Sequence, residues 1–139
     1  MNYYEVDIKP VDIQIYPNLK KTRHVGYDGM VPGPTFMMEK GTEAVVRFIN
    51  HADRETSVHL HGSYSRSLTP STSIYFVVSR NTMGTRADEL EPGRAPFDGW
   101  AEDTTFPGQY KDYYYPNAQN ARTLWYHDHA LDHTAVCWK

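Results

Sequence analysis

Two pairs of histidines with the same spacing stand far apart in this chain and are its best candidates for chemistry. One pair is His59 and His61, and the other is His127 and His129. On a β-strand, residues i and i+2 point to the same face, so each pair would present two imidazoles side by side. If the two strands are neighbours, four imidazoles converge. Imidazole suits copper, zinc, iron and nickel, so the sequence predicts a metal site made of nitrogen ligands.

The other histidines and the cysteine do not follow this pattern. A single histidine is more often structural than a metal ligand, and that is our interpretation of His24, His51 and His133. The single cysteine, Cys137, excludes an internal disulfide and has no histidine beside it. The predicted site therefore contains no thiolate.

The composition bounds the class of protein. With 139 residues, the chain is long enough for one domain with one core, which we place over residues 1–139. A formal net charge of −3 offers no electrostatic argument for binding nucleic acid. No apolar stretch of roughly 18 residues is present, so no membrane span is predicted. The N-terminus lacks a basic segment followed by an apolar one, so no secretory signal is predicted.

The elements that must position the histidines are expected to be short β-strands. Apolar residues alternate with polar ones at Val11, Ile13 and Ile15, as on a half-buried strand. Glycine and proline turn signals separate such stretches, and helical periodicity is almost absent. The pattern predicts an all-β chain folded as an antiparallel sandwich. The other expected strands are residues 44–49, 57–61, 109–115 and 122–127.

One segment, residues 67–94, does not share this pattern. It begins polar, contains one apolar burst at residues 74–78 and becomes charged at residues 86–91. Loops longer than about 15 residues without structure of their own are uncommon inside compact domains. We therefore predict that residues 67–94 are an atypical insert.

Four segments of the chain resemble those of a known enzyme family. They are residues 27–36 with Pro-Gly-Pro, 57–66 with the first histidine pair, 95–103 with Phe-Asp-Gly-Trp, and 124–130 with the second pair. Together they make the chain similar to the first cupredoxin domain of multicopper oxidases, and within that family to the bilirubin oxidase type. The resemblance implies a cupredoxin-like antiparallel Greek-key β-sandwich.

The resemblance also implies an activity, a cofactor and roles for the four histidines. Multicopper oxidases use a blue copper to take electrons from small organic donors such as bilirubin or phenols, and a trinuclear copper cluster to reduce O₂ to water. By similarity, His59 would bind the type 2 copper, and His61, His127 and His129 would bind the paired type 3 coppers. These are half of the cluster's ligands, and the C-terminal cupredoxin domain of the parent enzyme would supply the rest.

Asp98 matches an acidic residue that supplies protons to the cluster in the family. Reduction of O₂ to water consumes protons, and a carboxylate beside the metals can relay them. The alternative is that Asp98 only forms a turn with the glycine that follows it. For the aromatic residues Trp100, Trp125 and 113–115, we expect packing in the sandwich and, in a full-length enzyme, at a domain interface.

The chain departs from the family in three ways. It has no type 1 (blue-copper) site, because Cys137 lacks flanking histidines. It stops at Lys139, before a further strand of the family's sandwich, so we expect an incomplete C-terminus with an atypical end at residues 136–139. The third departure is the insert at residues 67–94. We interpret residues 67–94 and residues 136–139 as translated introns, a hypothesis that sequencing of mature transcripts tests.

These departures leave more than one function open. As a piece of a multicopper oxidase, the isolated chain is predicted to be catalytically inactive, because it lacks the copper that accepts electrons. It could instead be a non-catalytic copper-binding module, or a truncated gene-model product without function. A cupin-like enzyme fits less well, because cupins place a glutamate soon after their first histidine pair, and none follows His61 closely. The family is usually secreted, but the localisation, the electron donor and the oligomeric state of this chain stay open.

Overall fold

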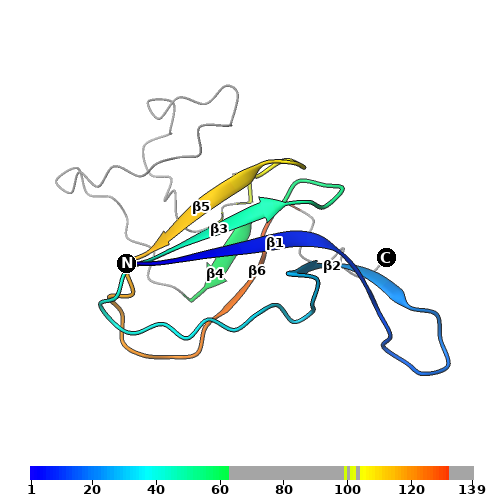
Figure 1. The fold of residues 1–139 in the computed structure, drawn as a ribbon, viewed down its shortest axis with the longest axis horizontal. Helices are drawn as coiled ribbons and strands as arrows, with labels where there is room; N and C mark the ends of the chain where they lie inside the picture. Colours follow the sequence, from blue (N-terminus) through cyan, green and yellow to red (C-terminus); the bar gives the residue numbers. More distant parts are fainter. Residues whose placement is uncertain (63–98, 100, 103, 132–139) are drawn as a thin grey trace.

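The computed structural model describes residues 1–62, 99, 101–102 and 104–131 as strands and connecting loops (Figure 1). This described part of the chain contains no helix, and therefore none long and apolar enough to cross a membrane. The prediction of an all-β chain is confirmed. The strands are β1 (Asn2–Ile13), β2 (Thr22–Tyr27), β3 (Ala44–Asn50), β4 (Val58–His61), β5 (Tyr110–Tyr115) and β6 (Trp125–Asp128).

The strands form two sheets. The larger sheet has the order β2-β1-β3-β5, and the smaller one consists of β4 and β6. Figure 1 shows β4 and β6 behind the larger sheet. Neighbouring strands are antiparallel except β1 and β3, which run parallel from Asn2 beside Ala44 to Ile8 beside Asn50. This pair differs from the expected antiparallel order because β2 and the connection of residues 28–43 return the chain to the start of β1 before β3 begins.

The core lies between the two sheets and follows the two-residue period of the strands. On β3, Val46 and Phe48 are buried while the intervening residues are half-buried, which agrees with the prediction for residues 44–49. Val11 and Ile13 are half-buried on β1 as expected, but Ile15 lies beyond the strand and is exposed. The buried cluster comprises Val6, Ile8, Val46, Phe48, Ala52, Val58, Tyr113 and Tyr115.

Tyr113 joins the two sheets. It is 1% exposed on β5, and its ring meets the ring of Phe48 edge-on at 5.6 Å. Its phenol oxygen accepts a hydrogen bond of 3.1 Å from the backbone N–H of Val58, the first residue of β4. A buried N–H is costly without an acceptor, so this bond helps to fix where β4 begins. Tyr113 and Tyr115 thus pack inside the sandwich as expected, while Tyr114 lies on the outer face.

Tyr126 anchors β6 in the same way. Its hydroxyl donates a hydrogen bond of 2.7 Å to the carbonyl oxygen of Pro34, which belongs to the Pro-Gly-Pro turn predicted from the sequence. Its ring packs against three other aromatic rings, with centroid distances of 4.8 Å to Tyr27, 5.7 Å to Phe36 and 6.1 Å to Phe48. The turn and the aromatic core together determine where the strand that carries the second histidine pair lies.

The strand β2 was not among the expected elements. The residues of β2 that pack against the core are Val25 and Tyr27, and both are only half-buried, while the alternate residues His24 and Gly26 are buried. Two apolar positions are too short an alternation for a sequence pattern to reveal the strand. His24 is buried there, and Nε2 of His51 lies 3.4 Å from the carboxylate of Asp7, in agreement with structural roles for both histidines. The predictions for residues 67–94, Asp98, Trp100, His133 and residues 136–139 concern positions outside the described residues.

Candidate metal centre

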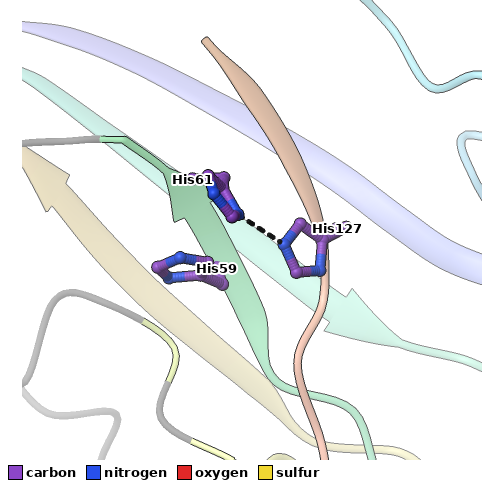
Figure 2. Close-up of side chains that lie close together, drawn as sticks. All are labelled: His59, His61 and His127. Atoms are coloured by element: carbon purple, nitrogen blue, oxygen red, sulfur yellow. Dashed lines mark hydrogen bonds between the residues drawn. The ribbon is translucent and has the colours of Figure 1, made fainter. Parts of the chain in front are cut away.

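The pairing of β4 with β6 brings the two histidine pairs together. In the antiparallel register, His59 stands opposite His127. The backbone N–H of His129 donates a hydrogen bond of 2.7 Å to the carbonyl of Ser57, which continues the pairing past the end of β6. Figure 2 shows His59 and His61 on β4 beside His127 on β6. The convergence expected from the sequence is therefore present in the fold.

The other face of the same two strands packs against the core, and this packing fixes the direction in which the histidines point. Leu60 stands opposite Tyr126, and both residues pack against the buried cluster. Because side chains alternate along a strand, the burial of Leu60 and Tyr126 turns the histidines to the opposite side. A register slip of one residue would exchange the two faces, so the apolar pair fixes the orientation of the site.

Three of the four imidazoles are close enough to share a metal ion. The ligand atoms of His59, His61 and His127 all lie within 4.8 Å of one another. Nδ1 of His61 is 3.4 Å from Nε2 of His127, the contact drawn as a dashed line in Figure 2. His129 adjoins them, because its ring stacks on that of His59 with centroids 4.7 Å apart. His59 and His127 are half-buried and the other two are exposed, so the cluster is open to solvent in this chain.

The spacing and the donor atoms fit the copper that the resemblance implies. A histidine nitrogen typically lies about 2.0–2.1 Å from a bound zinc, which separates two nitrogens at a tetrahedral angle by about 3.3 Å. The 3.4 Å between the nitrogens of His61 and His127 agrees with two ligands of one ion of this size. Imidazole nitrogen suits copper, and the affinity of such a site among divalent ions is highest for Cu²⁺.

Backbone carbonyls select the tautomers of two ligands. Nδ1 of His127 lies 2.8 Å from the carbonyl oxygen of Asp128, and Nδ1 of His129 lies 2.8 Å from that of Gly99. A carbonyl oxygen only accepts, so in each bond the imidazole Nδ1–H donates. This leaves the Nε2 lone pair of each ring available to a metal, and it restrains the ring plane as the outer contacts of metal ligands usually do.

Burial lowers the pKa of His127 below its ordinary value, and charge on the neighbouring His59, His129 and His61 would lower it further. The hydrogen bond to the carbonyl of Asp128 acts in the opposite direction. The uncharged imidazole is the form that binds a metal. The surroundings of His127 therefore favour its metal-binding form at neutral pH.

Asp128 contributes a support that the sequence analysis did not recognise. One oxygen of its carboxylate accepts hydrogen bonds of 3.0 Å from the backbone N–H groups of Ser57 and Ala130. The first bond holds the chain before β4, and the second closes a turn around His129. An aspartate that bonds a backbone N–H two residues later is a known turn signal, so its position between two histidines could have indicated this role.

Trp125 does not pack in the core of the sandwich, in contrast to the expectation from its residue type. It is 55% exposed and stands opposite His61 at the start of β6. Its indole stacks on the rings of His61 and His127. The alternation of β6 explains the difference, because the inward position is taken by Tyr126 and the residue before it must face the histidine side.

Comparisons with known proteins show which family the sequence resembles. The sequence model of the multicopper oxidase family matches residues 10–71 and 92–137. The chain is 53% identical over 133 residues to the bilirubin oxidase of Albifimbria verrucaria, and 29% identical over 154 residues to a laccase of Bacillus subtilis. These matches include 96% and 93% of this chain, which spans 18% and 26% of the length of those relatives.

Solved structures show the same fold. A multicopper oxidase from Pseudomonas thermotolerans superposes with a TM-score of 0.64 at 26% identity, over 93% of this chain and 25% of that one. A laccase from Pediococcus acidilactici superposes with a TM-score of 0.68 at 24% identity, over 97% of this chain and 23% of that one. The expected cupredoxin-like sandwich is confirmed. Because the family match covers most of the chain and both histidine pairs, this chain belongs to the multicopper oxidase family.

Proposed function

We propose that this chain supplies half of the histidine ligands of a trinuclear copper cluster. In this proposal His59 binds the type 2 copper, and His61, His127 and His129 bind the paired type 3 coppers. The observation that carries it is the 3.4 Å between the facing nitrogens of His61 and His127, on two strands far apart in the sequence. The two carbonyl contacts that leave Nε2 of His127 and His129 available support it further.

The parent enzyme in this proposal oxidises bilirubin- or phenol-type donors and reduces O₂ to water. Relatives named as a bilirubin oxidase and as laccases support this choice. This chain spans 18% of the bilirubin oxidase, so the other ligands and the copper that accepts electrons are assigned to a C-terminal cupredoxin domain. When bound, copper would supply the redox chemistry, and this chain's residues hold and orient its ligands.

Asp98 is proposed as the proton relay of the site. It lies outside the described residues, but its sequence neighbour Gly99 contacts His129 through the backbone carbonyl at 2.8 Å. O₂ reduction at the ligand set needs protons, and a carboxylate can relay them. In the full-length enzyme, Asp98→Asn should slow O₂ reduction most at high pH, and an unchanged pH profile would contradict the relay.

Copper titration of this chain tests the ligand assignment. We expect Cu²⁺ binding by calorimetry, with nitrogen hyperfine structure in the electron paramagnetic resonance (EPR) spectrum. The binding should be lost in the double variant His61→Ala, His127→Ala. His51→Ala, which removes an imidazole remote from the cluster, is the matched control and should bind copper like the wild type. Binding that survives the double variant would contradict the site.

The isolated chain is proposed to be catalytically inactive. Its one cysteine, Cys137, has no histidine beside it, so a copper-loaded sample should show no intense blue thiolate–copper absorption. It should also oxidise neither bilirubin nor phenols. Either signal from the purified chain would contradict the proposal and would show that electrons reach the cluster by another route.

A copper-binding module without catalysis is the second candidate function. It is favoured by the three ligand atoms within 4.8 Å, which could hold a single ion. The number of coppers bound distinguishes the module from the cluster proposal, when the copper titration is repeated with the full-length parent enzyme. A module would bind one copper per chain in both proteins, whereas a cluster requires three coppers at this position in the full-length enzyme.

The segments at residues 67–94 and 136–139 are proposed to be translated introns. The family match stops at residue 71 and resumes at residue 92, which supports an insert within residues 67–94. The same match continues to residue 137, inside the second segment, and lends that segment no such support. Mature transcripts that retain both segments would contradict the hypothesis.

A further inference from the structure

Trp125 lies at the exposed end of the histidine cluster, and its indole stacks on two of the four imidazoles. Its ring centroid is 4.2 Å from that of His127, with an angle of 27° between the planes. The centroid of His61 is 5.0 Å away, at an angle of 21°. Trp125 stands opposite His61 and two residues before His127, so strand geometry puts all three side chains on one face.

Packing of the core does not account for this tryptophan. The residue is 55% exposed, and the core lies on the other face of β6, where Tyr126 is placed. Among the described residues, the ring contacts of this half-exposed indole are those with His61 and His127. Stacked aromatic pairs at centroid distances of roughly 4.5–7 Å are favourable beyond the area that they bury.

We propose that Trp125 is a positioning residue that holds the ring planes of His61 and His127 in the orientation that binds metal. The inference rests on the proposed copper-binding function. An imidazole turns easily about χ2, whose torsional preference is broad. A flat ring stacked on one face of each imidazole restricts that rotation and leaves the nitrogen at the ring edge free.

His61 depends on this contact more than His127 does. The ring of His127 is also restrained by its 2.8 Å bond to the carbonyl of Asp128. The ring of His61 is exposed and meets those of His59 and His127 at interplanar angles of 68° and 41°. Among these ring contacts of His61, the one with Trp125 is face to face. Loss of the indole should therefore loosen His61 first.

A first test needs no copper. The ring current of an indole shifts the proton resonances of an imidazole stacked on it. In the copper-free chain, the ring protons of His61 and His127 should move toward their unstacked positions in Trp125→Leu, and only part of the way in Trp125→Phe. Phe106→Leu is the matched control, because Phe106 is 57% exposed on a loop and should not affect these resonances. Identical histidine resonances in the wild type and Trp125→Leu would overturn the inference.

A second test measures the metal site. We expect Cu²⁺ affinity to fall about tenfold in Trp125→Leu, and Trp125→Phe to recover most of it, as the strength of a stacked pair suggests. The EPR spectrum of Trp125→Leu should broaden or split into several species, because His61 would adopt several orientations. A residue that only supported the fold would lower the unfolding temperature and leave this spectrum unchanged.

The two proposals fail in different ways. A wild-type chain that binds no copper overturns the proposed function, and the copper-free spectra still decide whether Trp125 holds the rings. A wild-type chain that binds copper, together with a Trp125→Leu variant of equal affinity and identical EPR spectrum, overturns the role of Trp125 alone.

Discussion

The imidazole of His129 is held by the backbone of Gly99, whose carbonyl oxygen lies 2.8 Å from Nδ1 of the ring. The same glycine lies against β4 so closely that a Cβ at its position would be 1.9 Å from the carbonyl oxygen of Val58. Its φ of +54° lies in the left-handed region. One residue without a side chain therefore connects the strand of the first histidine pair to a ligand of the second.

Gly99→Ala should damage both the fold and the site. The left-handed conformation alone costs a residue with a Cβ about 1–2 kcal/mol, and the overlap with β4 adds to that. We expect a loss of at least about 2 kcal/mol in urea unfolding, and weaker Cu²⁺ binding because the carbonyl can no longer reach His129. Gly108→Ala is the control, since Gly108 has a similar positive φ but nothing within 4 Å of its Cβ position. Equal losses in the two variants would assign the effect to φ alone.

The carboxylate of Asp128 should be needed for its acceptor oxygen more than for its charge. Asp128→Ala removes the acceptor of two backbone N–H groups, of Ser57 and Ala130, and should cost roughly 2–3 kcal/mol in urea unfolding. Asp128→Asn keeps an oxygen at the same place and should recover more than half of that loss. A similar loss in both variants would show that the charge is what matters.

The position of the histidines was predictable because it depends on local geometry. A two-residue spacing on a strand puts His59 and His61 on one face whatever the rest of the fold does, and the same holds for His127 and His129. Their convergence needed only the pairing of β4 with β6. Apolar alternation likewise indicated β3, where every second residue is buried.

Other parts of the site depend on contacts that no local pattern encodes. The strand β2 has only two apolar residues against the core, Val25 and Tyr27, so its hydrophobic period is too short to be recognised in the sequence. The exposure of Trp125 follows from the register with His61, and residue type alone suggested burial instead. Gly99 supports the site through its close approach to β4, which becomes visible only when both segments are in place.

Tyr113→Phe should weaken the junction of the two sheets without changing the packing. The phenol oxygen of Tyr113 accepts the hydrogen bond of the buried Val58 N–H, and phenylalanine keeps the ring against Phe48. Leaving a buried donor without its acceptor costs about 1–3 kcal/mol, so the midpoint of urea unfolding should fall accordingly. Hydrogen exchange at the Val58 amide should accelerate more than exchange at the centre of β3. Uniform acceleration across both strands would show a general loss of stability instead.

Tyr114 should make the stability of the chain depend on pH above pH 10. Burial, the hydrogen bond to Glu43 and the negative charge of Glu43 together raise its pKa to about 12. The folded chain therefore holds this proton more tightly than the unfolded chain, in which a tyrosine ionises near pH 10. The stabilisation is complete below about pH 10 and is lost as the pH rises toward about 12.

The difference between wild-type and Tyr114→Phe phenolate absorbance isolates this one titration. It should show a midpoint near pH 12 in the folded chain and near pH 10 in urea. Glu43→Gln keeps a hydrogen-bond acceptor but removes the charge, so the folded midpoint should move part of the way down. The stabilisation comes from the protonated phenol. In Tyr114→Phe, the free energy of unfolding should therefore decrease less between pH 10 and pH 12 than in the wild type. A difference titration centred at pH 10 in the folded chain would show that Glu43 and burial do not act on Tyr114 in solution.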